Sequence, residues 1–131
     1  MHEKRTRLQL AIFAGGVAGA LARAGLDRLL PFHGHGWPWA TFTANVAGAA
    51  ALGYLATRLQ ERLPPSTYRR PFVGTGLCGA LTTFSTLQVE AIELARHGRA
   101  ALAVVYLAAT LAAGLAAVHA SSALTRRARL A

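Results

Sequence analysis

The chain is short, apolar and basic. It has 131 residues, of which 53% are hydrophobic and 15% charged, against about 25% charged in an ordinary soluble domain. This composition excludes a disordered chain and argues against a soluble enzyme, because most residues are too apolar to face water. The length fits one domain, 1–131. The single cysteine, Cys78, excludes an internal disulfide and a zinc site made of cysteines.

Four stretches of the chain contain no Asp, Glu, Lys or Arg, and a membrane-spanning helix needs about 20 mostly apolar residues. These stretches are 8–22, 29–57, 71–89 and 100–125. We therefore predict an all-α membrane protein with four transmembrane helices, at about 8–30, 38–58, 70–95 and 99–124. The first helix requires that the surrounding protein accommodates Arg23.

The basic residues flank these helices unevenly. Ten Lys and Arg lie on the side of the two termini and the second loop, and three lie on the opposite side. The ten are Lys4, Arg5, Arg7, Arg58, Arg62, Arg69, Arg70, Arg126, Arg127 and Arg129, and the three are Arg28, Arg96 and Arg99. The positive-inside rule then predicts a multi-pass protein of the cell membrane with both termini in the cytoplasm. Charges at membrane flanks also argue against nucleic-acid binding, which the net charge of +9 would suggest in a soluble protein.

The first predicted helix has three notable features. Its basic start, apolar run and Ala20-Leu21-Ala22 imitate a secretory signal peptide, but the glycine pattern inside the run argues against cleavage. Gly15 and Gly19 form a GxxxG motif, which lets two membrane helices approach closely.

Arg23 must find water, carbonyls or an acid inside the membrane, and Asp27 lies one turn further on the same face. Arg23 either snorkels to the interface or lies at the mouth of an anion path.

The second predicted helix contains Asn45. A buried asparagine must satisfy two N–H donors and one carbonyl, so it serves either as a hydrogen bond between helices or as part of a polar path.

The third predicted helix carries the strongest local signal. Three glycines and then four hydroxyl residues occupy the centre of the span, in the run 74–86. Glycine weakens a helix interior and β-branched threonine restricts it, so we predict a broken helix. Carbonyls released by such a break can bind a cation, and nearby hydroxyls can meet an anion. A polar seam between helices is the alternative.

The fourth predicted helix places Tyr106, Thr110 and Gly114 four residues apart on one face. They form either a packing seam or a track of hydroxyl groups along a pore. No paired carboxylates, nucleophile–base pair or phosphate loop accompanies them, so we do not expect an enzyme.

Three motifs in order resemble the Fluc (CrcB) fluoride channel family, over nearly the whole chain. They are Gly15-Gly16-x-x-Gly19-Ala20-x-x-Arg23, Thr41-x-x-x-Asn45-x-x-Gly48 and Gly76-x-Cys78-Gly79-x-Leu81-Thr82-Thr83-Phe84-Ser85-Thr86. The resemblance implies a fluoride-selective channel that passively exports the ion and so relieves its toxicity.

The resemblance also implies an assembly and a set of site residues. Two chains would pack antiparallel in the lipid membrane, with a structural sodium ion at the centre of the dimer. The backbone carbonyls of Gly79 and Thr82 would hold this sodium ion. The fluoride path would contain Asn45, Thr83, Phe84, Ser85, Tyr106 and Thr110, with Arg23 and Glu90 at a vestibule.

Two departures from the family pattern affect these expectations. Leu87 stands where the family usually has a second pore phenylalanine, so one of the two paths would be altered or closed. The uneven charge flanks make an antiparallel homodimer difficult to form, which favours a heterodimer with a homologous chain of opposite orientation.

Two other functions remain open from the sequence. Small multidrug transporters also have four helices, but they rely on a carboxylate deep in the first helix, and the stretch 8–22 contains none. The chain could also be the non-conducting partner of a heterodimeric fluoride channel.

Overall fold

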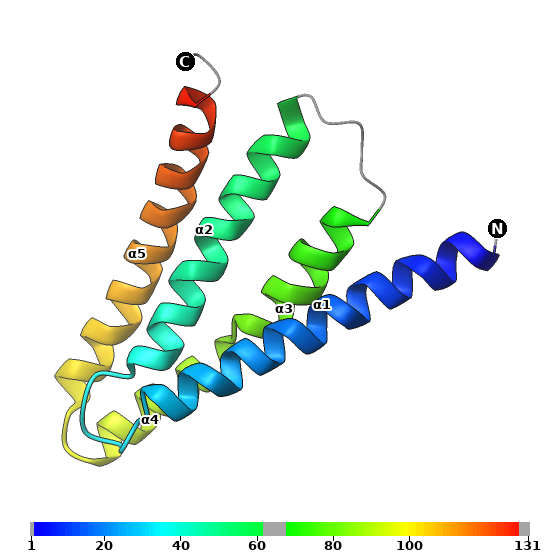
Figure 1. The fold of residues 1–131 in the computed structure, drawn as a ribbon. Helices are drawn as coiled ribbons and strands as arrows, with labels where there is room; N and C mark the ends of the chain where they lie inside the picture. The colour runs from blue at the N-terminus through cyan, green and yellow to red at the C-terminus, as the bar shows by residue number, and fades with distance from the viewer. Residues whose placement is uncertain (1, 62–67, 129–131) are drawn as a thin grey trace.

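A computed structural model describes residues 2–61 and 68–128, which form four helical segments and contain no strand (Figure 1). The first segment is α1 (His2–Leu29) and the second is α2 (Trp39–Glu61). The third is divided into a π-helix η1 (Arg70–Cys78), a single turn α3 (Gly79–Leu81) and α4 (Phe84–Arg96). The fourth is α5 (Ala100–Arg127). The all-helical prediction is confirmed for the described residues.

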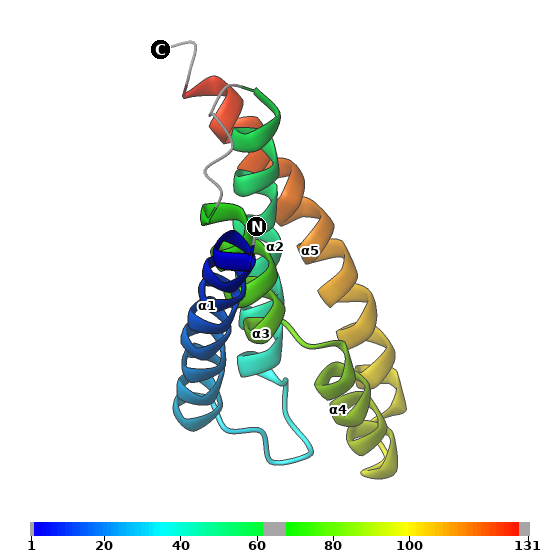
Figure 2. The same ribbon diagram turned by 90° about the vertical axis from the view of Figure 1, so that its right-hand side faces the viewer.

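The helices are arranged as two pairs linked by the divided segment. α2 lies along α5, and α1 lies along η1 and α3. α4 turns away from the axis of η1 and packs against the first half of α5, as the two views show together (Figures 1 and 2). The path of the third segment therefore begins beside α1 and finishes beside α5.

Glycines allow α1 and η1 to pack with their backbones in contact. Gly15, Gly19 and Gly76 are buried at this contact. A Cβ atom on Gly19 would collide with the carbonyl oxygen of Leu77, while one on Gly16 would meet nothing within 4 Å. The GxxxG motif thus serves close helix packing, as its spacing predicts.

A small apolar core joins α4 to α5. It consists of Leu87, Ala91, Leu94, Ala103 and Tyr106. Many other large apolar side chains point outward, and on α1 they form a stripe of Leu10, Phe13, Val17 and Leu21. Within the described residues, two helices, α1 and α5, are long and apolar enough to cross a membrane.

A loop over 30–38 and a short turn over 97–99 join the segments at the end where α1 finishes and α5 begins. Pro38, whose ring presets φ, directly precedes α2, and its carbonyl accepts the N–H of Phe42 at 3.1 Å. Gly98 has φ +77°, a conformation that costs glycine little, and it reverses the chain between α4 and α5. Gly34, with φ +80°, lies against the ring of His97.

The basic flanks fall at opposite ends of the helices. One end of the helices holds the start of α1 and η1 and the finish of α2 and α5 (Figure 1). Arg28, Arg96 and Arg99 lie at the opposite end. Arg62 and Arg129, which entered the orientation count, lie outside the described residues.

Candidate functional site

The third segment is interrupted by two residues that are not helical. Thr82 (φ −80°, ψ 149°) and Thr83 (φ −148°, ψ 126°) have extended backbones between α3 and α4. The N–H of Thr82 still bonds to the carbonyl of Cys78 at 3.0 Å, whereas the N–H of Thr83 leaves the helical pattern. Inside a membrane, backbone groups that leave the pattern need partners from the protein.

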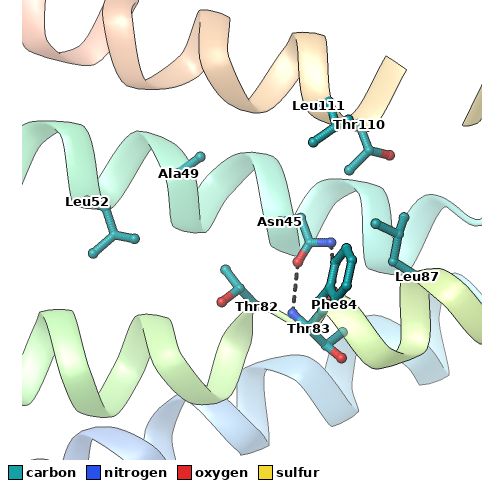
Figure 3. Close-up of a pocket in the computed structure, with 9 residues that line it drawn as sticks. All are labelled: Asn45, Ala49, Leu52, Thr82, Thr83, Phe84, Leu87, Thr110 and Leu111. Atoms are coloured by element: carbon teal, nitrogen blue, oxygen red, sulfur yellow. Dashed lines mark hydrogen bonds between the residues drawn. The ribbon is translucent and has the colours of Figure 1, made fainter. Parts of the chain in front are cut away.

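Asn45 supplies both partners to Thr83. Its Oδ1 accepts the backbone N–H of Thr83 at 2.9 Å, and its Nδ2 donates to the Thr83 carbonyl at 3.1 Å (Figure 3). One side chain of α2 thus pairs with a single residue as a neighbouring β-strand would. Of the two N–H groups of the amide, one remains for another acceptor.

The Thr83 side chain begins α4. Its Oγ1 accepts the backbone N–H of Thr86 at 3.2 Å, which is the N-cap bond that threonine commonly makes. The same hydroxyl lies 3.1 Å from the hydroxyl of Thr86 and 3.2 Å from that of exposed Ser85. The hydroxyl run 82–86 is therefore a local network that stabilises the break.

These bonds release two carbonyl groups from their helical partners. In a continuous helix the Gly79 carbonyl would accept the N–H of Thr83, which here goes to Asn45. The Thr82 carbonyl would accept the N–H of Thr86, which here goes to the Thr83 side chain. The carbonyls of Gly79 and Thr82 therefore lack the i+4 donors that a continuous helix would give them.

A cavity of about 280 Å³ lies beside the break, between α2, α4 and α5. It is lined by Asn45, Ala49, Leu52, Thr82, Thr83, Phe84, Leu87, Thr110 and Leu111. Most of these side chains are apolar, and Figure 3 shows the Phe84 ring beside the Asn45 amide. Phe84 is 70% exposed, whereas Leu87 is 4% exposed and belongs to the core. The cavity is shallow and open to the surface, with a mainly apolar lining and a few polar groups.

The threonine hydroxyls at this cavity are already engaged with their own helices. Thr110 donates to the carbonyl of Tyr106 at 2.7 Å, and Thr82 donates to the carbonyl of Cys78 at 2.7 Å. Each hydroxyl has one proton, so both present only acceptor lone pairs unless they rotate.

A second polar cluster lies nearer the end of α1, and it joins four helices. Arg23 Nη2 on α1 donates to Thr41 Oγ1 on α2 at 2.6 Å. Thr41 donates to Glu90 Oε1 on α4 at 2.8 Å, and the Tyr106 hydroxyl on α5 donates to Glu90 Oε2 at 2.7 Å. Thr41 and Tyr106 are 0% exposed and Glu90 is 6% exposed.

Arg23 has further bonding capacity at this cluster. It pairs with Asp27 at 3.1 Å, which confirms the pairing predicted from their four-residue spacing. Its Nη1 is buried and makes no hydrogen bond within the described residues. Trp37 covers the cluster, with its ring 5.4 Å from that of Tyr106 in an edge-to-face arrangement.

The residues predicted for the fluoride path are therefore divided between two places. Asn45, Thr83, Phe84 and Thr110 line the cavity, and Ser85 lies beside Thr83. Tyr106 does not line the cavity but belongs to the buried cluster with Arg23 and Glu90. Thr41 was not among the predicted site residues, although its place four residues before Asn45 indicates that both share one face of α2.

Comparison with known proteins identifies the family. The family of CrcB-like proteins, described as camphor resistance (CrcB), matches residues 10–122. A protein of Mycobacterium bovis named fluoride-specific ion channel FluC 1 is 56% identical over 120 residues, covering 92% of this chain and 91% of its own length. The fluoride-specific ion channel FluC of Chlorobaculum tepidum is 38% identical over 117 residues, covering 89% of this chain and 93% of its own.

These relatives are named as ion channels and not as enzymes, in agreement with the prediction from the sequence. Both the matched range and the identities extend over most of the chain, so the chain belongs to the CrcB family.

Proposed function

We propose that this chain forms a fluoride-selective channel in the cell membrane and passively exports fluoride, which reduces its toxicity. The similarity over 92% of the chain to a protein named as a fluoride-specific ion channel carries this proposal. The cavity beside Asn45 and Phe84 supports it, because both side chains can face an anion there.

The chemistry of the cavity suits a small, strongly hydrated anion. The path must replace water by hydrogen-bond donors, and the unused N–H of Asn45 and the exposed hydroxyl of Ser85 are available. The positive edge of the Phe84 ring can face an anion without holding it tightly. Thr83 and Thr110 add hydroxyls that donate to an anion after rotation. Weak, successive contacts of this kind allow the ion to leave as well as to enter.

We further propose that Tyr106, Glu90 and Arg23 form the end of this path nearer the loop 30–38. Arg23 contributes positive charge there, and its buried Nη1 is a donor still available to an anion.

The carbonyls of Gly79 and Thr82 would hold the structural sodium ion. They fit this role because their helical partners bond elsewhere and because they lie where α3 ends, the negative end of a helix dipole. Gly79 also has open space on the side where a Cβ would be, since nothing lies within 4 Å. When bound, sodium supplies fixed positive charge that lowers the cost of an anion at membrane depth.

We propose that all four helical segments cross the membrane, the third as a broken helix, with both termini in the cytoplasm. The outward apolar stripe of α1 and the charges grouped at the helix ends support this arrangement. Because the flanking charges are strongly biased, we propose that the unit is an antiparallel heterodimer with a homologous chain of opposite orientation.

Leu87 bears on how many paths conduct. It is buried against α5 and lines the cavity, so it fills the position with an aliphatic group that has no quadrupole edge. Because of Leu87, either one of the two paths in the dimer is altered or closed, or this chain is the non-conducting partner of a heterodimer.

Fluoride efflux from liposomes tests the proposal. The purified chain is reconstituted alone, and in parallel with a homologous chain of opposite charge bias, in sodium with chloride as the control anion. We expect selective fluoride efflux from the mixed preparation. Full efflux from the chain alone would contradict the heterodimer, and loss of efflux on changing Phe84 or Asn45 would reject a non-conducting role.

A further inference from the structure

Thr41 occupies an unusual position for a threonine on a membrane helix. Its side chain is fully buried, and its hydroxyl bonds to neither the carbonyl of its own helix nor solvent. It accepts from Arg23 on α1 at 2.6 Å and donates to Glu90 on α4 at 2.8 Å. The other threonines buried on α2 and α5 behave differently: Thr57, Thr110 and Thr125 all donate to carbonyls of their own helices.

Thr41 also stands between two opposite charges that do not pair directly. Arg23 forms an ion pair with Asp27 and not with Glu90. Within residues 2–61 and 68–128, no Lys, Arg or His lies within ion-pair distance of Glu90. The charge of Glu90 is met by two hydroxyls, those of Thr41 and Tyr106. A buried carboxylate that loses one of two such donors is left with an unsatisfied oxygen.

The spacing along the two helices gives this contact a geometric consequence. Thr41 and Asn45 are four residues apart, about 6 Å along one face of α2. Their partners Thr83 and Glu90 are seven residues apart, two helical turns along one face of α4. α2 therefore holds α4 at two points, one at its N-cap and one beyond Phe84 and Leu87.

The interruption at Thr82 and Thr83 means that α4 needs a second contact with α2 to fix its orientation. Because Thr82 and Thr83 are extended, the axis of α4 does not continue that of α3, and helix continuity does not fix its rotation. The contact with α5 is mainly apolar apart from the hydrogen bond from Tyr106 to Glu90, so Thr41 and Tyr106 hold the Glu90 carboxylate from two helices and together set the register of α4.

We propose that Thr41 is a positioning residue, which couples Arg23 to Glu90 and thereby fixes the rotation of α4 that presents Phe84 and Leu87 to the cavity. Thr41 acts through Glu90 and does not itself line the cavity. This inference rests on the proposed fluoride channel for its transport readout, but the hydrogen bond itself can be tested without transport.

The transport test compares three variants in whichever liposome preparation the wild type conducts. Thr41→Val keeps the shape and removes the hydroxyl, Thr41→Ser keeps the hydroxyl, and Thr57→Val is a matched control whose hydroxyl serves only its own helix. We expect initial fluoride efflux to fall about tenfold or more in T41V, and to stay within about threefold of wild type in T41S and T57V. Equal efflux in T41V and T57V would overturn the proposal, as would an equal loss in T41S and T41V.

A double-mutant cycle tests whether Thr41 acts through Glu90. If it does, T41V should cost much less in the Glu90→Gln background than in the wild type. Additive losses would show that Thr41 acts by another route. If T41V does not fold, Thr41→Ala and Thr41→Ser replace the comparison, since these two variants differ only by the hydroxyl.

An infrared measurement separates failure of this inference from failure of the proposed function. The carboxylate or carboxyl stretch of Glu90, assigned by its loss in E90Q, should shift in T41V and stay in place in T41S and T57V. If the Glu90 band shifts in T41V but the wild type transports no fluoride, the Thr41–Glu90 coupling is supported and the channel is rejected. An unchanged band in T41V would reject the coupling whatever the transport result.

Discussion

Asn45 on α2 bonds both backbone groups of Thr83, accepting its N–H at 2.9 Å and donating to its carbonyl at 3.1 Å. This pairing satisfies the extended residue at the break and places the remaining amide N–H of Asn45 at the cavity. The side chain that supports the break is therefore also the side chain that meets the ion in the proposed path.

Removal of the Asn45 amide tests the structural part of this pairing. In Asn45→Leu, both backbone groups of Thr83 lose their partners, and each buried unsatisfied group costs about 1–3 kcal/mol. We expect a clear loss of thermal stability in detergent together with loss of fluoride efflux.

Asn45→Asp separates the two bonds. Aspartate can still accept the Thr83 N–H, but as a carboxylate it cannot donate to the carbonyl and repels an anion. It should therefore retain more stability than N45L while losing efflux. Normal stability in N45L would show that Thr83 does not depend on this pairing.

The glycine contact between α1 and η1 gives a prediction with an internal control. A Cβ on Gly19 collides with the Leu77 carbonyl oxygen, whereas a Cβ on neighbouring Gly16 meets nothing within 4 Å. We expect Gly19→Ala to lower the unfolding free energy by about 1–3 kcal/mol, because overpacking forces the helices apart. Gly16→Ala should be neutral or stabilise the helix by about 0.5–1 kcal/mol. Thermal melts of both variants measure this difference in stability, and equal melting temperatures would contradict the predicted collision at Gly19.

The Thr83 side chain caps α4, and its hydroxyl can be removed without loss of shape. Thr83→Val should cost about 1 kcal/mol, the usual value of an N-cap bond, while Thr83→Ser should retain most of it. Chemical or thermal unfolding measures the difference. A T83V variant as stable as T83S would mean that the bond to the Thr86 N–H contributes nothing.

Replacing sodium tests the ion proposed at Gly79 and Thr82. Because the ligands are backbone carbonyls, no side-chain deletion removes them, so the ion itself must be exchanged. We expect prolonged dialysis into N-methylglucamine to reduce both melting temperature and fluoride efflux, and returned sodium to restore them. An effect equal in potassium and sodium would show a site for monovalent cations in general.

Leu87 allows a gain of function to be tested. The side chain lies between the apolar core and the cavity, so a larger ring has open space on one side. We expect Leu87→Phe to fold and to raise fluoride efflux severalfold, because it adds a ring edge to the path. Leu87→Ala should instead destabilise the contact of α4 with α5 by about 2–5 kcal/mol. Unchanged efflux in L87F would remove Leu87 as the cause of an altered path.

The sequence predicted four helical segments, because long apolar runs without charges are typical of membrane helices. Charges did not mark where the first one begins, since α1 starts at His2 and contains Lys4, Arg5 and Arg7. It also predicted a broken third helix, since glycines and threonines are poor in a helix interior, and in the structure the backbone is extended at Thr82 and Thr83. It did not reveal the π-helical winding of η1, Arg70–Cys78.

The site was harder to predict than the helices. Asn45 stood out because a lone amide in an apolar span needs partners, but the identity of Thr83 as that partner depends on tertiary packing. Tyr106 was expected along a pore, yet a tyrosine and a glutamate 16 residues apart meet only once α4 and α5 are packed. The spacing of Thr41 and Asn45 placed them on one face, but the bonds of Thr41 to Arg23 and Glu90 could not be predicted, since a threonine in a helix commonly bonds its own backbone.

Fluoride efflux from sodium-loaded liposomes is the most direct test of the central claim. With this chain and a homologous chain of opposite charge bias, we expect rapid efflux of fluoride and none of chloride. Absence of fluoride efflux from the mixed preparation and from the chain alone, with both proteins folded, would contradict the channel. Chloride efflux as fast as that of fluoride would contradict its selectivity.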